Sequence, residues 1–402
     1  MTARFFLKVA RMGIPRLRSY KGPAILSYGF RPFFLLGSLY AGLSILFWLP
    51  LYAGHLETYS LLAPLDWHVH EMLFGYLAAI VTGFLLTAIP NWTGRLPVQG
   101  YPLLGLVSIW IAGRFAVFFS SVIGWQVAAT VDAAFLGAVA LAATIEIVAG
   151  RNWRNLKVLL PLAMLLAANV CFHLEAHYFG LSDMSRRLGM SAAVLLVMII
   201  GGRIIPSFTR NWLVRQNPGR LPVPFNRFDV VSLVVGALAL VAWCFFPISV
   251  GTAVALGIAA ALQSVRLARW AGDRTIKDPL VLVLHFAYGF IPLGFALVAA
   301  SIVFPESLPI AAGMHALGGG AIGAMTLSVM VRATLGHTGR PLKAGHGAAF
   351  LFLAIIAAAG LRIAAVFLPE LHLIEMAGAA WSVAFLGFAA LFGKALLQPK
   401  LT

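Results

Sequence analysis

The sequence predicts an all-α membrane protein with twelve transmembrane helices, and composition and run length lead to this prediction. Of the 402 residues, 61% are hydrophobic and 10% are charged, and the mean hydropathy is +0.93. A soluble domain carries about a quarter charged residues. The apolar runs are long enough for helices of about 20 residues, whereas a β-barrel would need alternating segments of about 10. The composition therefore excludes a soluble enzyme and a disordered chain. Helices remain as the spanning elements because they satisfy all their backbone hydrogen bonds internally in lipid.

Proline, glycine and charged residues divide the apolar sequence into twelve predicted spans. In chain order they cover residues 25–52, 68–90, 102–122, 124–149, 157–179, 188–210, 229–247, 249–268, 279–303, 309–331, 345–367 and 371–394. No segment between them is long enough for a soluble domain. We therefore expect a basic cytoplasmic tail over residues 1–24 and a single membrane domain over residues 25–402.

The net charge of +16 comes from 29 basic against 13 acidic residues. If the N-terminus is cytoplasmic, the basic residues gather in the inner segments and the outer loops hold only Arg186 and Arg187. This asymmetry is the positive-inside pattern, so both termini are expected in the cytoplasm and the charge does not indicate nucleic-acid binding. Cys171 and Cys244 lie in apolar runs and predict neither a disulfide framework nor a zinc site.

An internal repeat relates the second and tenth spans, which align without a gap at an offset of 245 residues. His70 then matches His315, and Thr93-Gly94-Arg95 matches Thr338-Gly339-Arg340. The sixth span repeats the pattern more weakly in Ile205-Pro206-Ser207-Phe208-Thr209. The spacing predicts three repeats of four helices, with sites at the repeat junctions.

Histidines inside the spans are the first functional candidates, because an ionisable side chain in a bilayer is costly unless it is paired or ligated. His70, His315 and His173 fall at one depth in the outer leaflet. Two neutral imidazoles at equal depth on facing helices can hold one haem iron. We therefore predict His70 and His315 as axial haem ligands. The alternative is that each ring bonds a backbone carbonyl between helices.

A second, copper site is predicted from the fifth span. His173 and His177 are four residues apart on one helix face, which suits one metal ion, and His68 is a further candidate. Met72 and Met314 lie beside the predicted haem ligands and would favour Cu(I), although methionine more often fills gaps between helices.

Carboxylates and arginines within the spans complete the candidate site residues. Glu71 and Glu175 neighbour the histidine layer, where they could transfer protons or orient a ligand, or form salt bridges with arginine. Arg31 and Arg203 lie in the inner half, where they could bind a cofactor propionate or a lipid headgroup. They could instead pair with His285, an inner candidate metal ligand too far from the outer layer to share its iron.

Longer motifs carry a resemblance to a known family. They are Tyr28-Gly29-Phe30-Arg31-Pro32, Trp67-His68-Val69-His70-Glu71-Met72, Gly201-Gly202-Arg203-Ile204-Ile205-Pro206 and Arg332-Ala333-Thr334-Leu335-Gly336-His337. Together they resemble the NnrS family over nearly the whole chain. The resemblance implies a bacterial inner-membrane protein of nitric oxide metabolism that contains haem b and copper.

The architecture also resembles the catalytic subunit of haem–copper oxidases and nitric oxide reductases. In those enzymes histidines on the second and tenth helices hold a low-spin haem, and His70 and His315 occupy the matching places. The sixth and seventh spans lack the histidines of the binuclear copper site. We therefore expect that this chain does not form the binuclear site of those enzymes.

The leading hypothesis is a haem-containing inner-membrane redox protein of nitric oxide metabolism or nitrosative stress resistance, supplied by an unidentified electron donor. Two alternatives stay open. One is a transporter or metal-handling permease without catalysis, and the other is a haem protein that binds nitric oxide without turnover. The sequence favours a nitric-oxide-linked oxidoreductase without deciding whether nitric oxide is substrate or signal.

Overall fold

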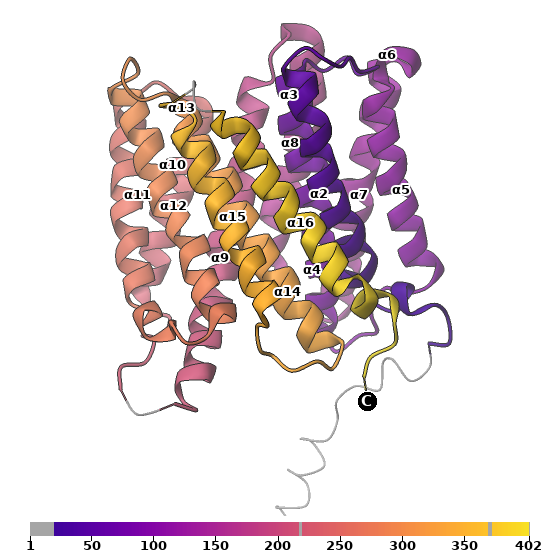
Figure 1. The fold of residues 1–402 in the computed structure, drawn as a ribbon, viewed down its shortest axis with the longest axis vertical. Helices are drawn as coiled ribbons and strands as arrows, with labels where there is room; N and C mark the ends of the chain where they lie inside the picture. Colours follow the sequence, from indigo (N-terminus) through magenta and orange to yellow (C-terminus); the bar gives the residue numbers. More distant parts are fainter. Residues whose placement is uncertain (1–19, 217–218, 369–371, 402) are drawn as a thin grey trace, which may run out of the picture.

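The computed structural model describes residues 20–216, 219–368 and 372–401, and within these ranges the chain forms helices and loops without a strand. Twelve of the helical segments are long and apolar enough to cross a membrane, which confirms the predicted fold class (Figure 1). Residues 1–19 of the expected basic tail lie outside the described residues.

The twelve spans comprise single helices and three composite ones. They are α2 (Phe30–Tyr52), α3 with η2 and α4 (Pro64–His70, Glu71–Leu77, Ala78–Thr93), α5 (Tyr101–Phe118), α7 (Trp125–Ala149), η3 with α8 (Trp153–Val158, Leu159–Phe179), α9 (Asp183–Leu213), α10 (Arg227–Phe245), α11 (Val250–Ala268), α12 (Pro279–Val303), α13 with η5 and α14 (Ile310–His315, Ala316–Gly323, Ala324–His337), α15 (His346–Ala364) and α16 (Leu373–Leu397). Short helical turns form η1 (Ala24–Leu26), α6 (Ser120–Ile123) and η4 (Gly272–Thr275).

Two helices begin earlier than predicted because residues at or near their first turn favour or stabilise a helix start. The second span begins at Pro64, a residue favoured at the first helical position, rather than at residue 68. Helix α9 begins at Asp183 rather than at residue 188, since the Glu175 carboxylate accepts hydrogen bonds from Ser185 N at 3.0 Å and Ser185 Oγ at 2.7 Å.

Two π-helical turns interrupt the second and tenth spans at equivalent places. η2 begins at Glu71 and η5 begins at Ala316, so their starts are 245 residues apart (316 against 71), the offset of the sequence repeat. π-Helical turns occur frequently at functional sites. Because they relate only two of the three proposed repeats, the three-fold repeat stays a prediction.

The second and tenth spans form the centre of the bundle, with 83% and 72% of their most apolar windows buried against at most 61% elsewhere. The last helix, α16, packs against the first, α2, where Trp381 Nε1 donates to Ala41 O at 3.0 Å. In the order α3, α2, α16, α15 and α13, each helix contacts the next.

Candidate functional site

Helix α3 carries two histidines that face opposite sides. His68 and His70 are two residues apart, which is about 200° of rotation at 3.6 residues per turn. His68 lines an apolar cavity towards α13, and His70 faces α7 and α8. One short helix therefore separates two different environments, which we call the outer pocket and the polar centre.

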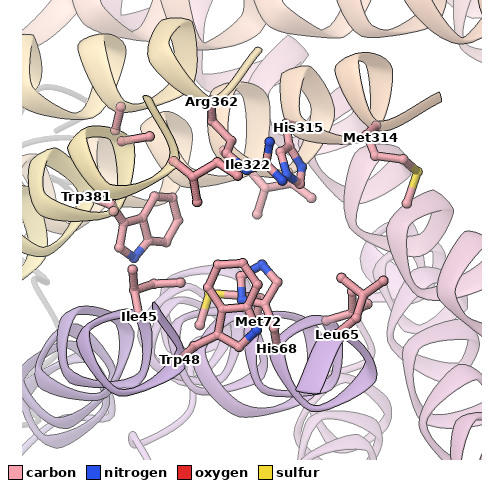
Figure 2. A pocket seen from close by; sticks show the side chains of 18 of the residues that line it. Ile45, Trp48, Leu65, His68, Met72, Met314, His315, Ile322, Arg362 and Trp381 are labelled. Carbon is pink, nitrogen blue, oxygen red and sulfur yellow. The ribbon is translucent and has the colours of Figure 1, made fainter. Parts of the chain in front are cut away.

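The outer pocket is a cavity of about 260 Å³ between α2, α3, η2, α9, α13, η5, α15 and α16. His68 and His315 enter it from opposite walls, as Figure 2 shows. The side chains labelled there are Ile45, Trp48, Leu65, His68, Met72, Met314, His315, Ile322, Arg362 and Trp381. The lining is thus apolar apart from a few basic groups.

Both pocket histidines carry a buried ring nitrogen, Nδ1 of His68 and Nε2 of His315, that has no hydrogen-bond partner. The His68 ring stacks on Trp48, with centroids 4.3 Å apart and planes at 26°, and Trp48 Nε1 donates to Pro64 O at 2.9 Å. An unpaired buried nitrogen costs about 1–3 kcal/mol. The pocket is therefore held ready for a group that pairs with imidazole.

Two arginines give the outer pocket a positive character. Arg186 Nη2 lies 3.1 Å from Asp66 Oδ1. Arg362 has no carboxylate within ion-pair distance among the described residues. A ligand with acidic groups would find a partner in Arg362.

The polar centre is the buried group of His70, Glu71, Arg114, Asp132 and His173. His70 Nδ1 lies 3.0 Å from Glu71 Oε1, and His70 Nε2 lies 3.1 Å from Asp132 Oδ2. His173 Nε2 also lies 3.1 Å from Asp132 Oδ2. Arg114 contacts both carboxylates, Glu71 through Nη1 and Asp132 through Nη2. Within this group one guanidinium contacts both carboxylates, and each imidazole lies beside at least one of these carboxylates.

Neighbouring side chains complete the polar centre. Asn169 Nδ2 donates to Asp132 Oδ2 at 2.7 Å, and the Tyr40 hydroxyl donates to Glu71 Oε2. Ligand atoms of His70, Asp132 and His173 all lie within 4.8 Å of one another. Two imidazoles and a carboxylate suit a transition-metal ion, and Glu71 on the far nitrogen of His70 is the usual partner of a metal-bound histidine. The same contacts also form a closed ion-pair network without a metal.

The structure brings His173 to His70 but not to His177. The ring centroids of His70 and His173 are 4.9 Å apart. His177 is exposed and stacks on Trp125 at 4.3 Å. Glu175 lies apart from the polar centre and holds the start of α9 through Ser185. His70 and His315 do not line one cavity, because His70 faces the polar centre.

The inner candidates lie at three separate places. Arg31 Nη1 donates to the carbonyls of Leu396 at 2.8 Å and Gln398 at 2.6 Å, so it holds the end of α16. His285 Nε2 lies 2.8 Å from Thr209 Oγ1. Arg203 Nη1 donates to Asn155 Oδ1 at 3.2 Å and lines a cavity at the inner end of the bundle. Arg31 and Arg203 therefore do not pair with His285.

Sequence reasoning missed the partners of Asp132 and Arg114 and the place of Arg362 in the outer pocket. Depth along the helices was an available signal. Asp132 lies seven residues after the start of α7 (132 against 125), and His173 lies six before the end of α8 (173 against 179). Antiparallel neighbours with such counts place these side chains at similar depth.

The fold and these buried groups define a polytopic helical membrane protein with histidine and carboxylate sites near one end of the bundle. The model of the NnrS protein family matches residues 24–400, so the chain belongs to the NnrS family. No curated protein matches the chain. Membership is consistent with a nitric-oxide-associated membrane protein, from a family associated with metal or haem binding.

Proposed function

We propose that this chain is a haem b-containing redox protein of nitric oxide metabolism, with the iron held between His68 and His315. One observation carries the proposal: two histidines with unpaired buried nitrogens face each other across an apolar cavity. His68 replaces His70 of the sequence-based pair, since both ring nitrogens of His70 lie 3.0–3.1 Å from carboxylates.

The side chains that line the outer pocket suit a haem chemically, but the pocket must enlarge to hold one. Apolar walls suit the macrocycle, and Arg362 and Arg186 suit its two carboxylates. The cavity of about 260 Å³ is slightly smaller than typical ligand pockets, which start near 300 Å³. Met72 and Met314 line it, and their unbranched side chains can rotate to enlarge it.

A bound haem supplies one-electron chemistry and affinity for nitric oxide. His68 and His315 would hold this group, and Trp48 fixes the plane of the His68 ring by stacking. The apolar walls exclude water from the site. This arrangement favours electron transfer over stable binding of nitric oxide without turnover.

We further propose the polar centre as the copper site, formed by His70, His173 and Asp132 in place of His173, His177 and His68. Copper accepts imidazole readily. Glu71 orients the His70 ring through Nδ1. Arg114 offsets the negative charge of the two carboxylates.

The proposed location is the bacterial inner membrane, with the tail over residues 1–24 and both termini in the cytoplasm. The distribution of basic residues supports it, because the loops at the end of the bundle nearest both sites carry few of them. The partners are then the lipid bilayer, nitric oxide and an unidentified electron donor.

The test is the optical spectrum of protein purified after expression with ample haem. His68→Ala and His315→Ala should each abolish the bis-histidine spectrum, whereas His177→Ala, which changes an exposed ring, should preserve it. Monodisperse elution of each variant controls for folding. A wild-type protein without haem absorbance would overturn the proposal and favour the permease hypothesis, and so would a haem spectrum that survives both substitutions.

A further inference from the structure

A second cavity lies at the opposite end of the bundle from the outer pocket. It has a volume of about 570 Å³ and is lined by α2, α4, α9 and α14. These helices reach this end where α4 stops at Thr93 and α14 stops at His337, near the C-terminus of the chain (Figure 1). We call it the inner cavity, and neither proposed cofactor site uses it.

Two arginines from different helices line the inner cavity. Arg203 comes from α9 and is exposed, and Arg332 comes from α14 and is half-buried. Among the described residues neither lies within ion-pair distance of a carboxylate, and Arg332 makes no hydrogen bond. A guanidinium offers five N–H donors. Most of the donors of this pair are therefore unused.

Aromatic rings hold both guanidinium groups in place. The Cζ of Arg332 lies 3.9 Å from the ring centroid of Phe208, and that of Arg203 lies 6.0 Å from the centroid of Trp92. Such cation–π contacts orient the charge without neutralising it. The guanidinium groups of Arg203 and Arg332 are therefore positioned to bind an anion.

Asp278 is the acidic residue with an electrostatic effect on Arg332, and it already caps a helix. Asp278 Oδ1 accepts a hydrogen bond from Leu280 N at 3.0 Å and caps α12. Burial raises the pKa of the Asp278 carboxyl above its usual value, and Arg332 opposes this. Among the described residues Asp278 and Arg332 lie beyond ion-pair distance, so the guanidinium keeps its donors for another anion.

Most of the remaining lining is apolar, with Phe34, Phe84 and Ile204 among it, and the polar side chains are those of Thr87, Asn91 and His337. Arg332 lies five residues before the end of its helix (332 against 337), which is roughly 8 Å at 1.5 Å per residue. That depth is close to the boundary between lipid headgroups and hydrocarbon, and apolar walls beside two free guanidinium groups suit an anionic head with an apolar body.

We propose that the inner cavity binds a phosphate group through Arg203 and Arg332. The favoured source is the headgroup of an anionic phospholipid, whose acyl chains would lie against Phe34 and Phe84. Free phosphate shares the same chemistry and is the other source.

The first experiment measures the unfolding midpoint of the full chain, purified in an uncharged detergent. Phosphatidylglycerol should raise the midpoint and phosphatidylcholine should not. A rise with phosphatidylglycerol but not with inorganic phosphate identifies the lipid, and an equal rise with inorganic phosphate identifies the free anion. Equal effects of both lipids, or no effect of either phosphatidylglycerol or phosphate, would overturn the proposal.

The second experiment titrates phosphatidylglycerol against variants. Arg203→Gln and Arg332→Gln should each weaken the apparent Kd by about tenfold, the scale of a charge-assisted hydrogen bond. Arg227→Gln, an exposed arginine at the start of α10 outside the cavity, should leave it unchanged. Equal weakening by all three would contradict the site.

If the glutamine variants do not fold, native mass spectrometry of the wild type and of Arg332→Lys decides. Lysine keeps the charge, so both proteins should retain phosphatidylglycerol in preference to phosphatidylcholine when the two are supplied equally. Wild-type protein without that preference would contradict the proposal.

Discussion

The outer pocket and the polar centre lie on two sides of α3 and treat their histidines in opposite ways. In the pocket, His68 and His315 each keep a buried nitrogen without a partner. In the centre, His70 and His173 both lie 3.1 Å from one oxygen of Asp132, and Arg114 contacts both carboxylates. Buried polar groups are nearly always paired in folded proteins. The pocket rings lie beside no carboxylate of the described residues and therefore indicate a ligand that binds between them, whereas the rings of the polar centre are already held beside Asp132 and could share it with a metal.

This contrast separates stability from ligand affinity. Changes in the polar centre leave a charge without its partner in a buried site, so they should lower the free energy of unfolding. Changes in the outer pocket remove few internal bonds, so they should alter cofactor binding with little effect on folding. The following substitutions test that separation.

The largest expected effect comes from Arg114→Leu, which leaves Glu71 and Asp132 as uncompensated buried carboxylates. Removing one partner of a buried ion pair costs about 3–5 kcal/mol. The Arg114 side chain is 7% exposed, against 43% for Arg95, which pairs with Glu146 at 2.6 Å on the surface.

Arg95→Leu is the matched control and should cost no more than about 1 kcal/mol. Denaturant unfolding in detergent measures both variants. Equal losses would contradict the view that the polar centre stabilises the fold.

A smaller effect is expected from Tyr40→Phe, which removes a hydroxyl donor from the Glu71 carboxylate. Hydrogen bonds to charged groups contribute about 1.5–3 kcal/mol, and those between neutral groups about 0.5–1.5 kcal/mol. Tyr76→Phe on the pocket side removes a neutral contact with Thr326 and is the control. Unfolding midpoints should fall further for Tyr40→Phe, and the reverse order would break the comparison.

The smallest cost for a single side chain is expected at one of two glycines in the π-helical turns, Gly75 and Gly318. A Cβ on Gly75 would lie 2.6 Å from Glu71 Oε2 and 2.8 Å from Arg114 Nη1, whereas one on Gly318 would meet only Met190 Cε at 3.4 Å. Gly75→Ala should therefore cost about 1–3 kcal/mol by overpacking the centre.

Gly318→Ala should be neutral, or stabilising by about 0.5–1 kcal/mol, because alanine is favoured over glycine within a helix. Thermal unfolding of the two alanine variants provides the measurement. A destabilised Gly318→Ala with an unaffected Gly75→Ala would reverse our assignment of the tightly packed side.

The fold could be predicted from the sequence because hydrophobic run length alone decides how many helices span a bilayer. The ends were less accurate, since capping contacts such as that of Glu175 with Ser185 depend on residues brought together by folding. Counting residues along each span also predicts a common depth for His70 and His173, whose rings lie 4.9 Å apart, while the depth of His315 stays a prediction. These features depend on local sequence.

The direction in which each side chain points could not be predicted from local sequence. His68 and His70 are close in depth but point to opposite sides, and only the packing of α3 against its neighbours decides which of them faces α13. The repeat aligns His70 with His315 in sequence, yet rotation of the helices puts them in different environments. Asp132 likewise joins His70 to His173 only because α7 and α8 lie against α3.

The most direct measurement is the haem and copper content, per chain, of His68→Ala and His70→Ala purified side by side with the wild type. Our account predicts that His68→Ala loses haem and keeps copper, and that His70→Ala loses copper and keeps haem. Loss of haem in His70→Ala together with its retention in His68→Ala would contradict the assignment of the two faces of α3.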